Sequence, residues 1–213
     1  LAKGVKTLKR HARATGPLRD LHVFLQDLPE LCADDAEIRA ALQIWFEREA
    51  ASHHKKLAKR LKSKRYQDSL EHWRNLIDSR KFQKLAATLR PKDIRRAVER
   101  RIKEFNKRTA ELMHTSPDED IHRLRKQLKR IRYLMELDAK TWKRNLKTLK
   151  ERQELYGRFQ DLHVQILLLD QFRQAAPEVL PAALNGIVET LGNHKANARK
   201  QILTLGGLDG APL

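Results

Sequence analysis

Residues 6–23, KTLKRHARATGPLRDLHV, and residues 147–164, KTLKERQELYGRFQDLHV, are two versions of one segment. They align without a gap at an offset of 141 residues, and 9 of the 18 aligned positions are identical. A unit repeated at this spacing is too long for a short-repeat solenoid. The duplication therefore predicts two homologous helical units, residues 1–90 and residues 91–213, within one domain.

A second, shorter match extends the duplication toward the end of each unit. At an offset of 140, the chain pairs His54, Lys55, Ala58 and Lys59 with His194, Lys195, Ala198 and Arg199. The second unit also has a helical stretch ahead of the duplicated segment, residues 117–138, whose counterpart would precede Leu1. We therefore expect the sequence to lack the first helix of the duplicated fold.

Apolar side chains recur every three or four residues along nearly the whole chain, and this period predicts helices throughout. Gly16-Pro17 and Gly157 predict helix ends. Ser116-Pro117-Asp118-Glu119 predicts a helix start, with Ser116 as the cap, Pro117 in the first turn and Glu119 at the capping-box position. The expected helices are residues 1–15, 18–28, 35–62, 67–79, 81–89, 93–114, 117–138, 141–156, 158–173 and 181–205.

The composition indicates an anionic partner. Lys and Arg number 45 against 27 Asp and Glu, which gives a formal net charge of +18 and a sequence pI near 10.3. A charge of this size favours association with polyanions. A single cysteine, Cys32, excludes an internal disulfide framework and is typical of a reducing compartment. The longest apolar run, residues 166–169, is far shorter than the roughly 20 residues that span a bilayer, so we expect a cytoplasmic protein without a membrane partner.

The helix expected over residues 117–138 has two distinct faces. At about 100° per residue, one apolar stripe consists of Ile121, Leu124, Leu128, Ile131 and Met135. The adjoining face carries His122, Arg125, Lys129 and Arg132. Residues 123–132 contain six basic side chains and no acid, so we expect these side chains to lack acidic partners one turn away. A charge run is usually a solvated surface, but this lack of partners favours a bound anion.

Two further stretches have the same character. Residues 53–65, HHKKLAKRLKSKR, hold seven Lys or Arg, two His and no acid, and place Lys55, Lys59 and Lys62 on one face. A third basic stripe consists of Lys6, Lys9, Arg10 and Arg13, and it is repeated at Lys147 and Lys150. Arg binds phosphate oxygens in a bidentate manner, whereas Lys supplies a mobile point charge. The mixture suits an irregular chain of phosphates.

The histidines divide into two groups. His22 and His163 follow Asp20 and Asp161 by two residues, so neither pair shares a helix face. We expect both histidines to pack or hydrogen-bond between helices, and both aspartates to lie near the starts of helices. His122 lies on the basic face, where a bound phosphate would favour its charged form. Weaker cases of the same kind are His54 and His194.

The sequence has no pattern of a familiar catalytic or cofactor site. It contains no Gly-rich phosphate loop, no Gly-x-Ser-x-Gly, no Cys/His nucleophile pair and no zincin spacing. Its acidic residues are dispersed, whereas a metal-dependent phosphate-ester hydrolase needs them gathered. Trp45, Trp73 and Trp142 are too scattered to stack bases and are expected in packing. We therefore expect no catalysis, no metal and no cofactor.

Two motif groups resemble the CHAD family, whose name records histidines on an α-helical domain. They are His122-Arg123-Leu124-Arg125 with Lys129-Arg130-Ile131-Arg132-Tyr133, and Leu149, Gly157 and Asp161-Leu162-His163-Val164. The resemblance covers essentially the whole chain and implies an all-α fold. In that fold two pseudo-symmetric four-helix bundles meet around a central basic groove or pore. It also implies non-catalytic binding of inorganic polyphosphate and recruitment to polyphosphate granules.

Carried over by position, the resemblance implies that the phosphate contacts are His122, Arg125, Lys129, Arg130 and Arg132. Further candidates in the duplicated segments are Lys6, Lys9, Arg13 and Arg19, with Lys147, Lys150 and Arg158. The basic stretches near the ends of the units add Lys55 and Lys59, with His194, Lys195 and Arg199. Many relatives have Asp where His22 and His163 stand, so the resemblance transfers no role to these two.

The expected function is therefore multivalent binding of polyphosphate. A helical module that binds nucleic acid would have the same charge footprint, and it is the alternative that the sequence leaves open. The chain has no recognisable recognition helix and no aromatic platform, which disfavours that alternative.

Overall fold

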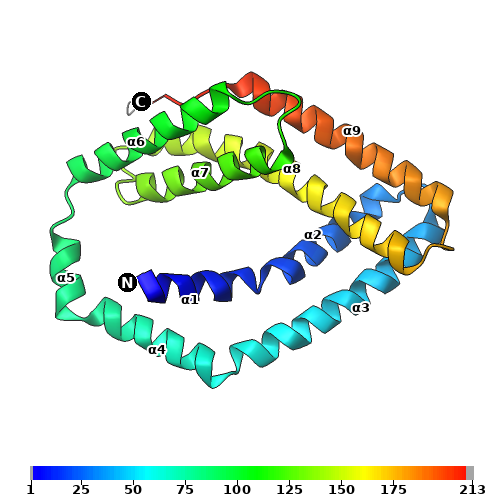
Figure 1. The fold of residues 1–213 in the computed structure, drawn as a ribbon, viewed down its shortest axis with the longest axis horizontal. Coiled ribbons are helices and arrows are strands. Elements are labelled where there is room, and N and C mark those ends of the chain that lie inside the picture. Colours follow the sequence, from blue (N-terminus) through cyan, green and yellow to red (C-terminus); the bar gives the residue numbers. More distant parts are fainter. Residues whose placement is uncertain (1, 210–213) are drawn as a thin grey trace. The chain divides into compact units, whose positions relative to one another are not determined.

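The computed structural model describes residues 2–209, and every regular element in that range is an α-helix (Figure 1). This confirms the all-helical prediction; the expected start at Leu1 lies outside the described residues. The helices are α1 (Ala2–Arg13), α2 (Gly16–Leu31), α3 (Ala36–Leu61), α4 (Lys64–Asp78), α5 (Arg80–Ala87), α6 (Pro91–Ala110), α7 (Asp118–Glu136), α8 (Lys143–Ala175) and α9 (Pro181–Leu205). No helix within residues 2–209 is long and apolar enough to cross a membrane.

The chain forms two compact units, and neither is a contiguous stretch. Unit 1 comprises residues 1–87 and 164–190, and unit 2 comprises residues 88–163 and 191–213. The long helices α8 and α9 each contribute one part to each unit. The pseudo-symmetric pair of four-helix bundles and the central basic groove stay predictions.

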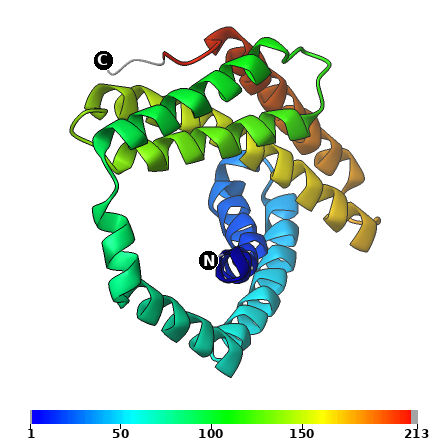
Figure 2. The same cartoon turned by 60° about the vertical axis from the view of Figure 1, so that its left-hand side comes forward.

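The core of unit 1 is built where α2 packs against α3 (Figure 2). Phe24 of α2 and Phe46 of α3 are fully buried, and their ring centroids are 4.4 Å apart. Trp45 packs edge-on against Phe46 and also against Phe172 from the last part of α8. These aromatic contacts bury large apolar areas, which is the main source of stability in such a core. The expectation that Trp45 serves packing is confirmed.

The core of unit 2 is built where α6 packs along α7 (Figure 2). The apolar stripe predicted for α7 is buried completely, because Ile121, Leu124, Leu128, Ile131 and Met135 are each at most 2% exposed. Ile94, Val98, Ile102 and Phe105 of α6 form the facing stripe. Trp142, which precedes α8, is fully buried in the same unit, as expected for a packing residue.

The helix end predicted at Gly157 is wrong. Residues 143–175 form one uninterrupted helix, in which Gly157 lies near the middle. Gly157 does not adopt the positive φ that ends many helices, whereas Gly206, just beyond α9, does, with φ of 59°. Asp161 consequently lies inside α8 and not near a helix start. The break predicted at Gly16-Pro17 is confirmed, because α1 ends at Arg13 and α2 begins at Gly16.

The helical position of Gly157 gives a test of this correction. A Cβ added there would meet nothing within 4 Å, so Gly157→Ala should raise the free energy of unfolding by about 0.5–1 kcal/mol, through the lower backbone entropy of the unfolded chain. The matched variant Gly206→Ala should lower it, because alanine is strained at a φ of 59°. Urea denaturation followed by circular dichroism measures both. Destabilisation by Gly157→Ala would contradict a regular helix at this position.

Candidate anion-binding site

The basic side chains of α7 lie at the edge of the buried stripe. His122, Arg125, Lys129 and Arg132, which we call the basic face, are all half-buried, and they follow one another at three- and four-residue intervals. Burial of the adjoining stripe fixes the rotation of α7 and therefore the direction of this face. Long basic side chains in such a position pack their stems and keep their charged ends near water. The face can thus present several positive charges along one line.

Two glutamines of α8 contact the two ends of the basic face. At one end, His122 Nδ1 is hydrogen-bonded to Gln160 Oε1. At the other end, Arg132 donates to Gln153 Oε1 over 2.9 Å, and Gln153 Nε2 donates to the Leu128 carbonyl over 3.1 Å. The two glutamines are seven residues apart, which places them on the same side of α8. They therefore hold the basic face against α8 at both ends.

The environment of His122 determines how it can meet an anion. An amide oxygen only accepts, so Nδ1 carries the proton that is donated to Gln160, and Nε2 is an acceptor in the neutral ring. Burial lowers the pKa of His122, the hydrogen bond with Gln160 opposes this shift, and Lys126 adds to it. Free His122 is therefore neutral at pH 7, and its Nε2 can donate to an anion only after taking up a proton.

Acidic partners do exist at both ends of the basic stretch, which corrects the expectation that they are missing. Arg132 forms an ion pair with Glu136 at 3.1 Å. Arg123 forms ion pairs with Asp120 at 3.2 Å and with Glu119 at 3.8 Å. The expectation failed because it counted acids only within residues 123–132, whereas helical partners lie three or four residues away in either direction.

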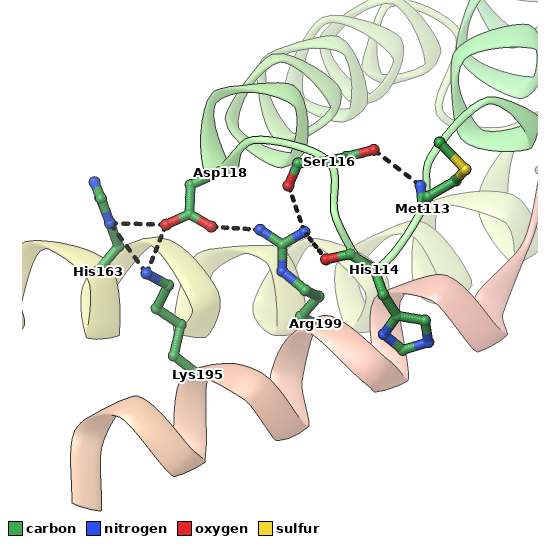
Figure 3. A network of polar contacts seen from close by, with 7 residues as sticks. All are labelled: Met113, His114, Ser116, Asp118, His163, Lys195 and Arg199. Carbon is green, nitrogen blue, oxygen red and sulfur yellow. Dashed lines mark hydrogen bonds and ion pairs between the residues drawn. The ribbon is translucent and has the colours of Figure 1, made fainter. Parts of the chain in front are cut away.

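A cluster of charges surrounds Asp118, the first residue of α7 (Figure 3). Lys195 and Arg199 reach it from α9, with Lys195 Nζ 2.5 Å from one carboxylate oxygen and Arg199 on the other. His163 of α8 lies 3.2 Å from Asp118. We call Asp118, His163, Lys195 and Arg199 the Asp118 cluster. It confirms that His163 is a hydrogen-bonding group between helices.

Arg199 also binds the loop that leads into α7. Its guanidinium donates to the carbonyl of Ser116 over 2.6 Å and to that of His114 over 3.1 Å (Figure 3). The predicted capping by Ser116 is wrong, because its hydroxyl accepts from the Met113 amide at 2.9 Å and Pro117 occupies the cap position. Arg199 donates to loop carbonyls and so does not cap the helix amides, but it fixes the position of the loop that leads into α7.

The ion pairs outweigh the desolvation of Asp118. Burial alone raises the pKa of this carboxyl, but hydrogen bonds and charge from Lys195 and Arg199 act more strongly together, so the pKa lies below its ordinary value. Asp118 is therefore ionised at neutral pH. The binding of phosphate by Lys195 and Arg199 stays a prediction; both lie on α9, outside the basic face of α7.

The other predicted contacts in unit 2 lie outside the basic face. Arg130 is exposed and, at about 100° per residue, points away from Arg125 and Lys129 on α7. Exposed positions on α8 and α9 hold Lys147, Lys150, Arg158 and His194. Their binding of phosphate stays a prediction.

In unit 1, the predicted contacts are exposed on three helices. They are Lys6, Lys9 and Arg13 of α1, Arg19 of α2, and Lys55 and Lys59 of α3. Arg19 lies 3.5 Å from Asp20.

Unit 1 also contains a basic cluster that sequence reasoning did not single out. His11 of α1 packs edge-on against Tyr66 of α4, with ring centroids 4.9 Å apart. Burial lowers the pKa of His11, and the charges of Arg60, Arg10 and Arg65 lower it further. Arg60 donates to the Arg10 carbonyl over 2.9 Å. In unit 2, sequence reasoning gave no role in the site to Asp118, Gln153 or Gln160. The seven-residue spacing of the two glutamines is a signal for that pair, and Asp118 has no comparable signal.

Comparison with known proteins identifies the family. The family model of the CHAD domain matches residues 2–170, which is most of the chain. The chain belongs to the CHAD domain family. No curated protein and no solved structure matches it.

Among residues 2–209, no group of three or more His, Cys, Asp or Glu side chains is placed to hold a metal ion.

The contact between His122 and Gln160 predicts a shift that NMR can measure. Gln160→Leu removes the acceptor that favours the protonated ring, so it should lower the pKa of His122 further. Gln153→Leu is the matched control, because Gln153 contacts Arg132 and leaves His122 untouched. Titration of the histidine ring resonances measures both. An equal pKa of His122 in the two variants would disprove the role of Gln160.

Proposed function

We propose that this CHAD domain binds inorganic polyphosphate without catalysis, through the basic face of α7. The observation that carries the proposal is the alignment of His122, Arg125, Lys129 and Arg132 along the edge of a buried apolar stripe. Membership of the CHAD family supports the same ligand class. Four basic groups in one row, spaced along a rigid helix, match a linear polymer of phosphates better than a compact anion.

The binding would be electrostatic and multivalent. The net charge of +18 attracts any polyanion, and release of condensed counterions adds to the driving force. The exposed cations Lys55 and Lys59 of unit 1 would supply additional contacts for a long chain. Affinity should therefore rise with the number of phosphates and fall steeply with salt.

We further propose a cytoplasmic location at polyphosphate granules, and no phosphate release in the presence of Mg²⁺ or Mn²⁺.

The basic face can be tested with charge-matched variants. Arg125→Ala with Lys129→Ala removes two positive charges from the basic face, and Arg123→Ala with Lys126→Ala removes two from exposed positions elsewhere on α7. The first pair should weaken binding of long-chain polyphosphate by about tenfold or more, because charge-assisted contacts are lost. The second should act only through net charge and weaken it less. Titration at fixed ionic strength, with circular dichroism to check folding, measures both.

Two outcomes would contradict the proposal. One is an equal loss of affinity in the two double variants, which would mean that net charge alone governs binding. The other is displacement of polyphosphate by RNA at matched ionic strength and matched phosphate concentration, which would favour the nucleic-acid alternative.

His122 predicts a pH dependence of binding. A phosphate near Nε2 favours the charged ring and raises the pKa of His122 above its lowered value in the free protein. Binding then takes up a proton, so affinity should increase as the pH falls from about 8 to about 6. His122→Gln cannot titrate and should lose this part of the dependence. Polyphosphate titrations of both proteins at several pH values measure the difference, and parallel pH profiles would exclude His122 as a contact.

A further inference from the structure

The Asp118 cluster joins three separate segments at one carboxylate. Asp118 begins α7, His163 comes from α8, and Lys195 and Arg199 come from α9. Arg199 is only 14% exposed and Lys195 is 22% exposed, so water screens these pairs less than pairs on an open surface. Both cations also lie near the face of the Phe159 ring, at 5.8 Å for Lys195 and 5.6 Å for Arg199. The first turn of α7 is thereby held in one position.

The cluster is one helical turn away from the basic face. Asp118 and His122 are four residues apart on α7 and therefore point to the same side. Both line one pocket of about 80 Å³, together with Glu119, Phe159, Gln160 and His163. Gln160, whose hydrogen bond orients His122, lies on the same stretch of α8 as His163, which contacts Asp118. A shift of the first turn of α7 would therefore move His122 away from Gln160.

We propose that Asp118 is a positioning residue for the anion-binding site: it does not touch the anion, but it holds the start of α7 so that His122 and the basic face have their binding geometry. The inference rests on the proposed function. It makes a prediction opposite to that of simple electrostatics. Removing a negative charge from a protein that binds a polyanion should strengthen binding through net charge, whereas loss of Asp118 should weaken it.

The test compares two aspartates of the same turn, Asp118 and Asp120. Asp118→Asn disrupts the cluster, whereas Asp120→Asn removes the same charge at a residue that pairs only with Arg123 on the helix surface. We expect Asp118→Asn to weaken binding of long-chain polyphosphate by about tenfold, a loss typical of positioning groups around a binding site. We expect Asp120→Asn to leave the affinity unchanged or slightly higher. Without ligand, the Nδ1–H resonance of His122 should shift in Asp118→Asn only.

Further variants keep the test decisive if Asp118→Asn is unstable. Arg199→Lys retains the charge but cannot bridge the carboxylate and the two loop carbonyls, so it should weaken binding in the same direction. Phe46→Leu in the core of unit 1 destabilises the fold without touching the cluster and should leave binding and the His122 resonance unchanged below its melting temperature.

Tighter binding by Asp118→Asn, or equal effects of the two aspartate variants, would overturn the proposal. If the unmodified chain does not bind polyphosphate, the proposed function fails. The His122 resonance, which needs no ligand, still tests the positioning role of Asp118 in that case.

Discussion

Burial of one apolar stripe on α7 is the constraint on which the rest of unit 2 depends. Five side chains from Ile121 to Met135 are buried where α7 packs along α6, and their burial leaves α7 a single favourable rotation. The basic residues that alternate with the stripe must then lie at its edge. Complete burial would remove their hydration at a cost of several kcal/mol per charge, and these residues are only half-buried.

The positive charge of the chain is not distributed uniformly. Some cations are engaged by carboxylates, as in the pairs of Arg132 with Glu136 and of Arg199 with Asp118. The formal excess of +18 shows that there are far too few carboxylates to pair with all of them. The structure uses its acids at specific points, above all at the start of α7. There one carboxylate, Asp118, contacts three side chains from α8 and α9.

Prediction from the sequence succeeded where the signal depends on helical period. The stripe from Ile121 to Met135 was identified correctly because each position is set by its neighbours three and four residues away. It failed at helix ends. Gly157 and Ser116 carry local end and start signals worth about 1 kcal/mol each. The continuous helix α8 overrides the first signal, and the Ser116 hydroxyl accepts from the Met113 amide of the preceding loop in place of a helix amide.

The sequence by itself therefore determined the all-helical class, the buried face of α7 and the row of cations beside it. Only the tertiary structure decided which cations meet carboxylates and which glutamines contact the row. The physical reason is the distance along the chain over which each interaction acts. Helical period and amphipathicity act within about one turn, whereas Asp118 is 77 residues from Lys195 and 81 from Arg199 along the chain, and folding alone brings these charges together.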